Sequence, residues 1–522
     1  MSSLFERLHR FPPDASSSPQ EVEKKHAFLS CCSSIFFPST GSLLLRCLFL
    51  AAVGVAGTEV LVWLWSGWCL FPSLIWNDVR LAPTIALHLG LPVYPTAREG
   101  IVNTWTYGPV PVVLMWPATF ARSAAGALMI AGGLNILLSV SAITVVCASW
   151  PIREVRTSAM SARFVAVLLC IGVWPQLCFH NLQADNVAVA FGLIGNLLLV
   201  RARNPASRWA AALCAMAALA SKQTSLGPAL AQILWLLVAK DRGEGIRHAG
   251  RCLLSGLALA GIFLTDFGWP GLWYTLIELP SRFPWMDVPH QRLFDLSPYL
   301  LIHLGLPAAA MLAWRKWFWS KESPLLLPAI TWCAAFPFGF AAMMKLGGSV
   351  NSLHGLLLWL PPVLTYLLSS APRPHAGSWR SIFACLAAVG LASLRLTQVP
   401  ALPLTPCIES YRQADHLTHL LPDTIWFPWN PLVTLYSERR YYHDEDGMYV
   451  RFVSGQPITF SHARRHLPAR FCVIALPRRW NSWGIAFNLA PPHAIRREFG
   501  LWTLLSWPVE HPPPNADSTV AN

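Results

Sequence analysis

The stretch that decides the fold is an apolar run, "LLRCLFLAAVGVAGTEVLVWLWS" at residues 44–66, followed by "WNDVRLAPTIALHLGLPVYP" at residues 76–95. A helix needs about 20 predominantly apolar residues to cross the hydrocarbon core of a bilayer. The first segment is long enough, and the second places Asp78 and Arg80 shortly after it. The pattern predicts a membrane-spanning helix with a carboxylate at the edge of the membrane.

The composition extends this prediction to most of the chain. Of the 522 residues, 54% are hydrophobic and only 12% are charged, which excludes a soluble protein of this length. Further candidate spans lie near residues 124–149, 163–179, 184–200, 209–220, 224–239, 251–266, 298–314, 324–343, 352–370 and 380–396. We therefore expect an all-α polytopic membrane protein of about 11 transmembrane helices, with interfacial helices in the outer loops.

The charges of the loops predict how the chain is oriented, because Lys and Arg in short loops stay on the cytoplasmic side. Basic and acidic loops alternate, for example Arg201 with Arg203 on one side and Asp185 on the other. This pattern predicts a cytoplasmic segment at 1–43, a transmembrane domain at 44–396 and an extracytoplasmic domain at 397–522. Short β-rich pieces broken by Pro and Gly indicate that the last domain is small and either α/β or β-rich.

Several classes of partner and cofactor are disfavoured. The net charge of +13 is spread over many short loops, so nucleic-acid binding is not expected. The 13 cysteines lie mostly in apolar spans without metal-ligand spacing, and no glycine-rich phosphate loop is present. No cofactor is indicated, although a divalent metal is compatible with the sequence. Cys407 and Cys472, in the outer domain, either form a disulfide or stay reduced.

Two carboxylates lie where predicted helices begin on the outer side. Asp78 precedes an apolar helix expected at 79–89, and Asp185 heads the helix expected at 184–200. Asp is a favoured N-cap residue, which gives one interpretation of both positions. The other interpretation is proton abstraction from a substrate, which also requires a positioned carboxylate.

Cations gather on the same predicted side. Lys222 follows an apolar run at the outer side, either snorkelling to the interface or binding an anion there. The stretch "MKLGGSVNSLH" at 344–354 adds Lys345 and two glycines at the head of a late helix, where backbone N–H groups favour an anion. Carboxylates beside cations suit a negatively charged lipid head group and a nucleophile that must lose a proton.

The order of these motifs resembles the GT-C superfamily of integral-membrane glycosyltransferases, which includes protein mannosyltransferases and the aminoarabinose and galacturonic-acid transferases of bacterial envelopes. The motifs are "ND.R", "G.PVYP" and "TYGPVP" in the first outer loop, then "AD", "SKQT" and "K.GGS.N" in later loops. The resemblance covers about residues 44–396. In this chain the acid of the first outer loop, Asp78, is preceded by Asn77, whereas the family more often has two adjacent acids there.

The resemblance implies inverting transfer of a sugar from a polyprenyl-phosphate donor to a lipid, glycan or protein acceptor, at the outer face of the cytoplasmic membrane. It maps the catalytic carboxylates onto Asp78 and Asp185. It maps the donor-phosphate cations onto Lys222, Lys345 and Arg80. The remaining residues expected to line the substrate cleft are Asn77, Tyr94, Tyr107, Gln223, Arg282, Asn351 and His354.

Two alternatives to a glycosyltransferase stay open. A transporter or flippase for a lipid-linked or anionic substrate would also carry ionisable residues in and near the membrane. A structural membrane subunit without chemistry is a second rival. In the outer domain, "HDEDG" at 443–447 resembles a cation-binding loop, but we expect a solvated turn there.

Overall fold

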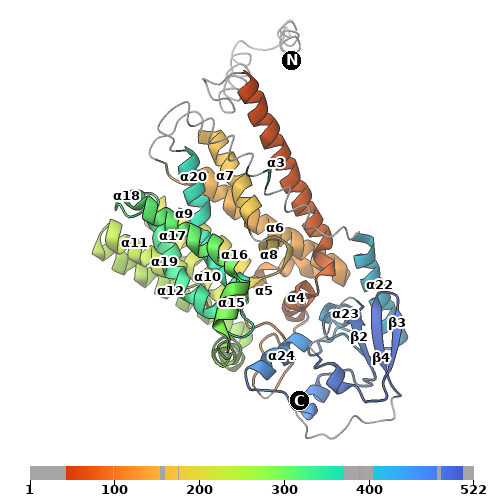
Figure 1. Ribbon diagram of the computed structural model, residues 1–522. Helices are drawn as coiled ribbons and strands as arrows, with labels where there is room; N and C mark the ends of the chain where they lie inside the picture. Colours follow the sequence, from red (N-terminus) through yellow and green to blue (C-terminus); the bar gives the residue numbers. More distant parts are fainter. Residues whose placement is uncertain are drawn as a thin grey trace, which may run out of the picture.

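The computed structural model describes residues 43–97, 99–152, 159–174, 176–369, 387, 389–390, 404–478 and 484–508. The described chain consists of a helical bundle and a smaller C-terminal part that lies against one end of it (Figure 1). The start of helix α3 and the C-terminal part lie at opposite ends of the molecule (Figure 1). The predicted cytoplasmic segment 1–43 is outside the described residues except for Leu43.

Five described helical segments are long and apolar enough to cross a membrane. They lie in α3 (Leu43–Leu70), α6 (Ala124–Ser149), α12 (Arg242–Phe267), α19 (Leu326–Met343) and the run of η5 (Val350–Trp359) with α20 (Leu360–Ser369). A bent pair, Pro289–Asp295 with Ser297–Ala313, would make a sixth span. The chain is therefore an integral membrane protein.

The other helices of the bundle are shorter. Those at predicted spans are α7 (Ala159–Val173), α8 (Gln176–His180), α9 (Ala184–Val200), α10 (Pro205–Ser221) and α11 (Gly227–Ala239). The bent pair is made of α15 (Pro289–Asp295), α16 (Ser297–Leu300), η4 (Leu301–Gly305) and α17 (Leu306–Ala313). The connecting elements are α4 (Ile75–His88), α5 (Pro109–Leu114), η2 (Trp116–Phe120), α13 (Trp269–Trp273), η3 (Tyr274–Glu278), α14 (Leu279–Ser281) and α18 (Arg315–Phe318). The count of 11 spans stays a prediction, because most of 380–396 is not described.

The C-terminal part combines short helices with a small sheet. Its helices are α22 (Leu404–Leu420), α23 (Pro431–Ser437), α24 (Glu445–Val453) and α25 (Phe460–Arg465). The strands β1 (Ile425–Trp426), β2 (Val473–Pro477), β3 (Ile495–Phe499) and β4 (Trp502–Ser506) pair in the order β1-β2-β4-β3. β1 and β2 are parallel and the other two pairs are antiparallel. A small α/β unit was one of the two expectations.

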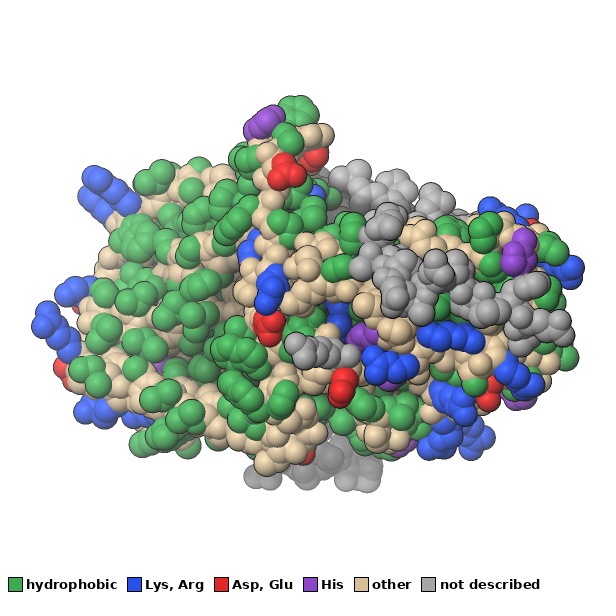
Figure 2. Space-filling model, turned by 90° about the horizontal axis from the view of Figure 1, so that it is seen from below, with side chains coloured by type: hydrophobic (Ala, Val, Ile, Leu, Met, Phe, Trp, Pro, Cys, Tyr) green, Lys and Arg blue, Asp and Glu red, His purple; other side chains and the backbone are tan. Residues whose placement is uncertain are grey.

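Helix α4 packs against the C-terminal part. Its apolar side chains, among them Val79, Leu81 and Ile85, are buried and belong to the same hydrophobic core as Trp426 and Trp429 of the C-terminal part. The two parts thus share one core instead of being joined only by a linker. On the face shown in Figure 2, Lys and Arg side chains gather over the C-terminal part, and hydrophobic side chains cover most of the bundle except at its far edge.

Candidate active site

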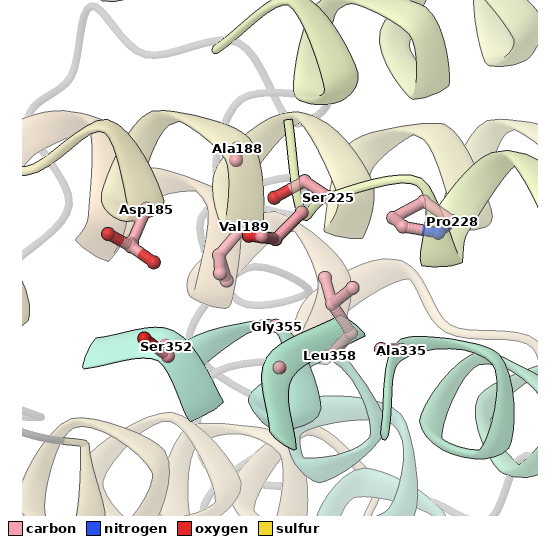
Figure 3. Close-up of a pocket in the computed structure, with 11 residues that line it drawn as sticks. Asp185, Ala188, Val189, Ser225, Pro228, Ala335, Ser352, Gly355 and Leu358 are labelled. Carbon is pink, nitrogen blue, oxygen red and sulfur yellow. The ribbon is translucent and has the colours of Figure 1, made fainter. Parts of the chain in front are cut away.

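A buried ion pair joins α9 to the end of α10. Nζ of Lys222 lies 2.5 Å from Oδ1 of Asp185, and the two side chains are only 7% and 5% exposed. The amide of Asn351, in η5, donates to the other carboxylate oxygen of Asp185 at 3.3 Å. Three predicted site residues from three distant segments therefore meet at one point. Figure 3 shows Asp185 at one side of a small pocket, with Ser352 across from it and Ser225 beyond Val189.

Local structure accounts for this convergence. Helix α9 begins at Ala184, as expected, and Asp185 lies in its first turn. Helix α10 ends at Ser221 because Lys222 has an extended backbone, which turns its side chain out of the helical row. Asn77 fixes the chain just before α9, since its amide donates to the carbonyl of His180 at 3.0 Å and accepts from the N–H of Leu182 at 2.8 Å.

Arg80 and Tyr107 lie near the ion pair. Burial lowers the pKa of the Arg80 guanidinium, and nearby Tyr107, Asp446 and Asp185 act in the opposite direction. Nη1 of Arg80 is buried and has no hydrogen-bond partner among the described residues. Nζ of Lys222 lies 5.7 Å from the centre of the Tyr107 ring. A buried donor with positive charge is therefore available close to the Asp185–Lys222 pair.

The loop that carries Tyr107 is held by the predicted cleft residues. The hydroxyl of Tyr94 donates to the carbonyl of Tyr107 at 3.1 Å and accepts from the Trp105 indole at 3.3 Å. Gln223 donates to the carbonyls of Thr106 at 2.8 Å and Leu276 at 3.1 Å. Tyr94 and Gln223 thus fix the shape of the cleft through backbone contacts.

An apolar cavity of about 330 Å³ opens beside Gln223. Its walls come from α10, α12 and the α13–η3 segment, with Leu259, Phe263, Trp273 and Leu276 among the lining residues. Pockets of about 300–1,000 Å³ are typical of small-molecule sites. Gln223 follows Lys222 directly in the chain, so adjacent residues link the cavity to the polar site, although Lys222 and Asp185 do not line the cavity.

Asp78 faces another part of the molecule. Its carboxylate is fully buried and accepts hydrogen bonds from the Tyr411 hydroxyl at 2.6 Å, the Leu432 N–H at 2.9 Å and the Asn430 amide at 3.3 Å. Burial raises the pKa of Asp78 to about 7, and the three donors oppose this rise. The N-cap interpretation is wrong for Asp78, because Leu74 occupies that position and Asp78 lies within the first turn of α4.

Three other predicted site residues make contacts of their own. Nζ of Lys345 donates to the carbonyl of Pro280 at 3.0 Å. Arg282 forms an exposed ion pair with Glu278 at 3.0 Å. The ring of His354 is buried, with Nδ1 3.3 Å from Sγ of Cys178. These contacts, within the described chain, do not include Asp185 or Lys222.

The acidic segment at 443–447 contacts the loop that carries Tyr107, which the sequence did not predict. The expected solvated turn is wrong, because Asp444 and Glu445 are fully buried. The N–H of Thr104 donates to Asp444 at 3.0 Å, and the hydroxyl of Thr104 donates to Asp446. In the sequence, the only sign of this contact is the run of three acids at 444–446. The loop that they contact lies about 340 residues earlier in the chain.

The fold of this chain is similar to that of a solved membrane protein. ArnT from Cupriavidus metallidurans, in a crystal structure bound to undecaprenyl phosphate, superposes with a TM-score of 0.55 at 12% sequence identity. That match covers 87% of this chain and 97% of ArnT. The apo structure of the same protein gives a TM-score of 0.52 at 13% identity, over 83% of this chain and 93% of that one.

The chain has the GT-C fold. Arabinosyltransferase EmbB from Mycobacterium smegmatis is less similar, with a TM-score of 0.36 at 13% identity over 91% of this chain and 46% of EmbB. No family model and no curated protein match the sequence. Within the described part of the chain, no group of three His, Cys, Asp or Glu side chains could hold a metal ion.

Proposed function

We propose that this protein is an inverting glycosyltransferase that moves a sugar from a polyprenyl-phosphate donor to an acceptor hydroxyl. The observation that carries the proposal is the buried Asp185–Lys222 pair, which adjoins an apolar cavity through Gln223. Such a donor combines a long apolar chain with an anionic phosphate, and these two neighbouring environments match its two halves. The GT-C fold, shared with a protein crystallised with undecaprenyl phosphate, supports the same assignment.

The apolar cavity is proposed to take the part of the lipid next to the phosphate. Its described lining is almost entirely apolar, apart from Gln223 at one side. Burying apolar surface there contributes about 25 cal/mol per Å². Gln223 is already tied to two carbonyls, so it stays in place as the lipid enters.

The donor phosphate is proposed to bind between Lys222 and Arg80. Arg80 offers a buried Nη1 that has no partner among the described residues. Lys222 is paired with Asp185 in the structure, so a phosphate that attracts Lys222 weakens this pair. A fixed cation stabilises the leaving phosphate more as the glycosidic bond breaks and negative charge develops on its oxygen. Phosphate binding would thus release the carboxylate when it is needed.

Asp185 is proposed to act as the catalytic base. The acceptor oxygen forms a bond to the anomeric carbon, its proton moves to a carboxylate oxygen of Asp185, and the polyprenyl phosphate leaves with the bonding electron pair. Asn351 holds the second carboxylate oxygen and orients the group. A positioned base typically contributes about 10²- to 10⁴-fold. Asp78, whose carboxylate is occupied by the C-terminal part, is assigned to holding that part in place.

The loop charges support a site on the outer side of the membrane. With basic loops in the cytoplasm, the Asp185 end of the bundle and the residues after 396 face outward. The residues 397–522 would then form an extracytoplasmic domain over the site, next to an envelope lipid, glycan or protein acceptor. The helical part 44–396 would be the catalytic domain.

The test is transfer by the purified protein in detergent, where no sealed membrane exists. Polyprenyl-phosphate donors with radiolabelled sugars are incubated with envelope lipids and glycans, and product is followed by mass. Wild type and Asp266→Asn, which alters an exposed acid at the end of α12, are expected to form product. Asp185→Asn and Lys222→Met are expected to lose it. Full activity of Asp185→Asn overturns the mechanism, and a flippase would form no product under these conditions.

A further inference from the structure

A second polar cavity, of about 260 Å³, lies at the junction between the bundle and the C-terminal part. We call it the junction cavity. One wall is the start of α6, with Arg122 and Ser123 before Ala124. The other wall comes from α22 and α23. The residues of that wall are Ile408, Tyr411, Arg412, Asp415, Val433 and Tyr436.

The two walls each supply an arginine. Arg122 has no ion pair among the described residues, and the nearest carboxylate to Arg412 is Glu409, at 3.7 Å with both side chains largely exposed. An exposed pair at that distance contributes little, so both guanidinium groups are available to a ligand. Asp415 also lines the cavity, 3.8 Å from the ring of His419. The lining therefore carries a net positive charge.

Neutral donors add to the two cations. The junction cavity is lined by Ala124 and Ala125, the first residues of the 26-residue helix α6, whose N-terminal N–H groups and dipole favour an anion. The hydroxyl of Tyr436 is buried and has no hydrogen-bond partner within the described residues. A buried hydroxyl without a partner costs free energy, which a bound acceptor would recover.

We infer that the junction cavity binds a phosphate-type anion, held between Arg122 on the bundle and Arg412 on the C-terminal part. Arginine suits this ligand because its planar fork can bond two phosphate oxygens at once. None of the residues that line this cavity belongs to the Asp185–Lys222 pair or the apolar cavity. The site is therefore separate from the proposed donor site.

The bound anion would join the two parts of the molecule. Tyr411 lines the junction cavity and also donates to Asp78, so the cavity is next to the bond that fixes the C-terminal part on α4. Since α6 is long and apolar enough to cross a membrane, the cavity lies where that span ends. Phospholipid head groups and soluble phosphates both reach this depth, and both carry the required chemistry.

Binding is measured on the full-length protein in a neutral detergent, by native mass spectrometry with phosphatidylglycerol and by thermal unfolding with added inorganic phosphate. We expect Arg122→Gln and Arg412→Gln each to weaken binding about fivefold, and Asp415→Asn to strengthen it. Arg497→Gln, on the exposed strand β3, is the matched control and should bind like wild type.

The two ligands distinguish the sources of the anion. Saturable binding of phosphatidylglycerol without any effect of inorganic phosphate identifies a lipid head group, and competition by inorganic phosphate identifies a general phosphate site. Lys222→Met should leave either result unchanged, which separates this site from the proposed donor site. Equal binding by wild type, Arg122→Gln, Arg412→Gln and Asp415→Asn overturns the inference.

Discussion

The hydroxyl of Tyr411 donates a hydrogen bond of 2.6 Å to Oδ2 of Asp78, across 333 positions of the sequence. The Leu432 N–H bonds the other oxygen of the same carboxylate at 2.9 Å. Both donors belong to the C-terminal part, and the acceptor lies on α4 directly after the first predicted span. The carboxylate predicted at the edge of the membrane is thus one of the points at which the two parts of the protein are joined.

Tyr411→Phe tests this joint. Above about pH 7, where Asp78 is ionised, removing the hydroxyl takes one donor from a buried carboxylate, and a hydrogen bond to a charged group is worth about 1.5–3 kcal/mol. We expect the free energy of unfolding to fall by about that amount and the C-terminal part to become more sensitive to protease. Tyr442→Phe removes a hydroxyl that donates to Glu438, a partly exposed carboxylate of the same part, and it should cost less. Equal protease sensitivity of the two variants would contradict the assignment.

The pH dependence of docking follows from the same carboxylate. The pKa of Asp78 is raised from 3.8 to about 7, so the folded state holds a proton that the unfolded state releases between these values. The stability of the docked state should therefore fall as pH rises from about 4 to about 7, and this contribution should be flat above that range. Asp78→Asn removes the slope.

His443 changes the pH dependence of stability in the direction opposite to Asp78. Burial lowers the pKa of this ring, so its contribution to stability rises as pH rises through the ordinary range of histidine. The informative quantity is the difference in unfolding free energy between wild type and Asp78→Asn at each pH, because the histidine contribution cancels in it. A difference that does not change between pH 4 and 7 would rule out titration of Asp78 in the fold.

The sequence predicted the local elements of the site better than their assembly. Helix α9 spans 184–200 as expected, because a continuous apolar run between polar ends defines both of its limits. The clustering of Asp185, Lys222 and Asn351 agrees with the shared sidedness of their loops. The partners of Asp78 could not be predicted, since no local pattern encodes a contact with Tyr411.

The Asp185–Lys222 pair should behave as a unit in transfer assays. Asp185→Asn removes the proposed base and should lower kcat about 10²- to 10⁴-fold. Lys222→Met removes the cation that stabilises the leaving phosphate and should lower kcat by about 10²-fold or more. Because each change also leaves the other member buried without its partner, the double variant should lose much less than the product of the single effects. Independent, multiplicative losses would indicate that the two groups do not act on one reaction step.

The substitution Gly447→Ala tests whether the C-terminal part positions the loop that carries Tyr107. A Cβ at this position would lie 2.4 Å from the backbone carbonyl carbon of Asn103, so Gly447→Ala must push α24 away from the loop. Overpacking of this kind typically costs about 1–3 kcal/mol. The shift also separates Thr104 from Asp444, whose carboxylate accepts its N–H.

We therefore expect Gly447→Ala to lower kcat for sugar transfer while the protein still inserts and binds its lipid donor. Gly250→Ala is the matched control, because a Cβ there meets nothing within 4 Å and Gly250 lies inside helix α12. Donor binding, measured by native mass spectrometry, should be the same in both variants, since the apolar cavity does not include the loop at 103–104. If Gly447→Ala turns over like Gly250→Ala, the C-terminal part docks on the loop without positioning it for catalysis.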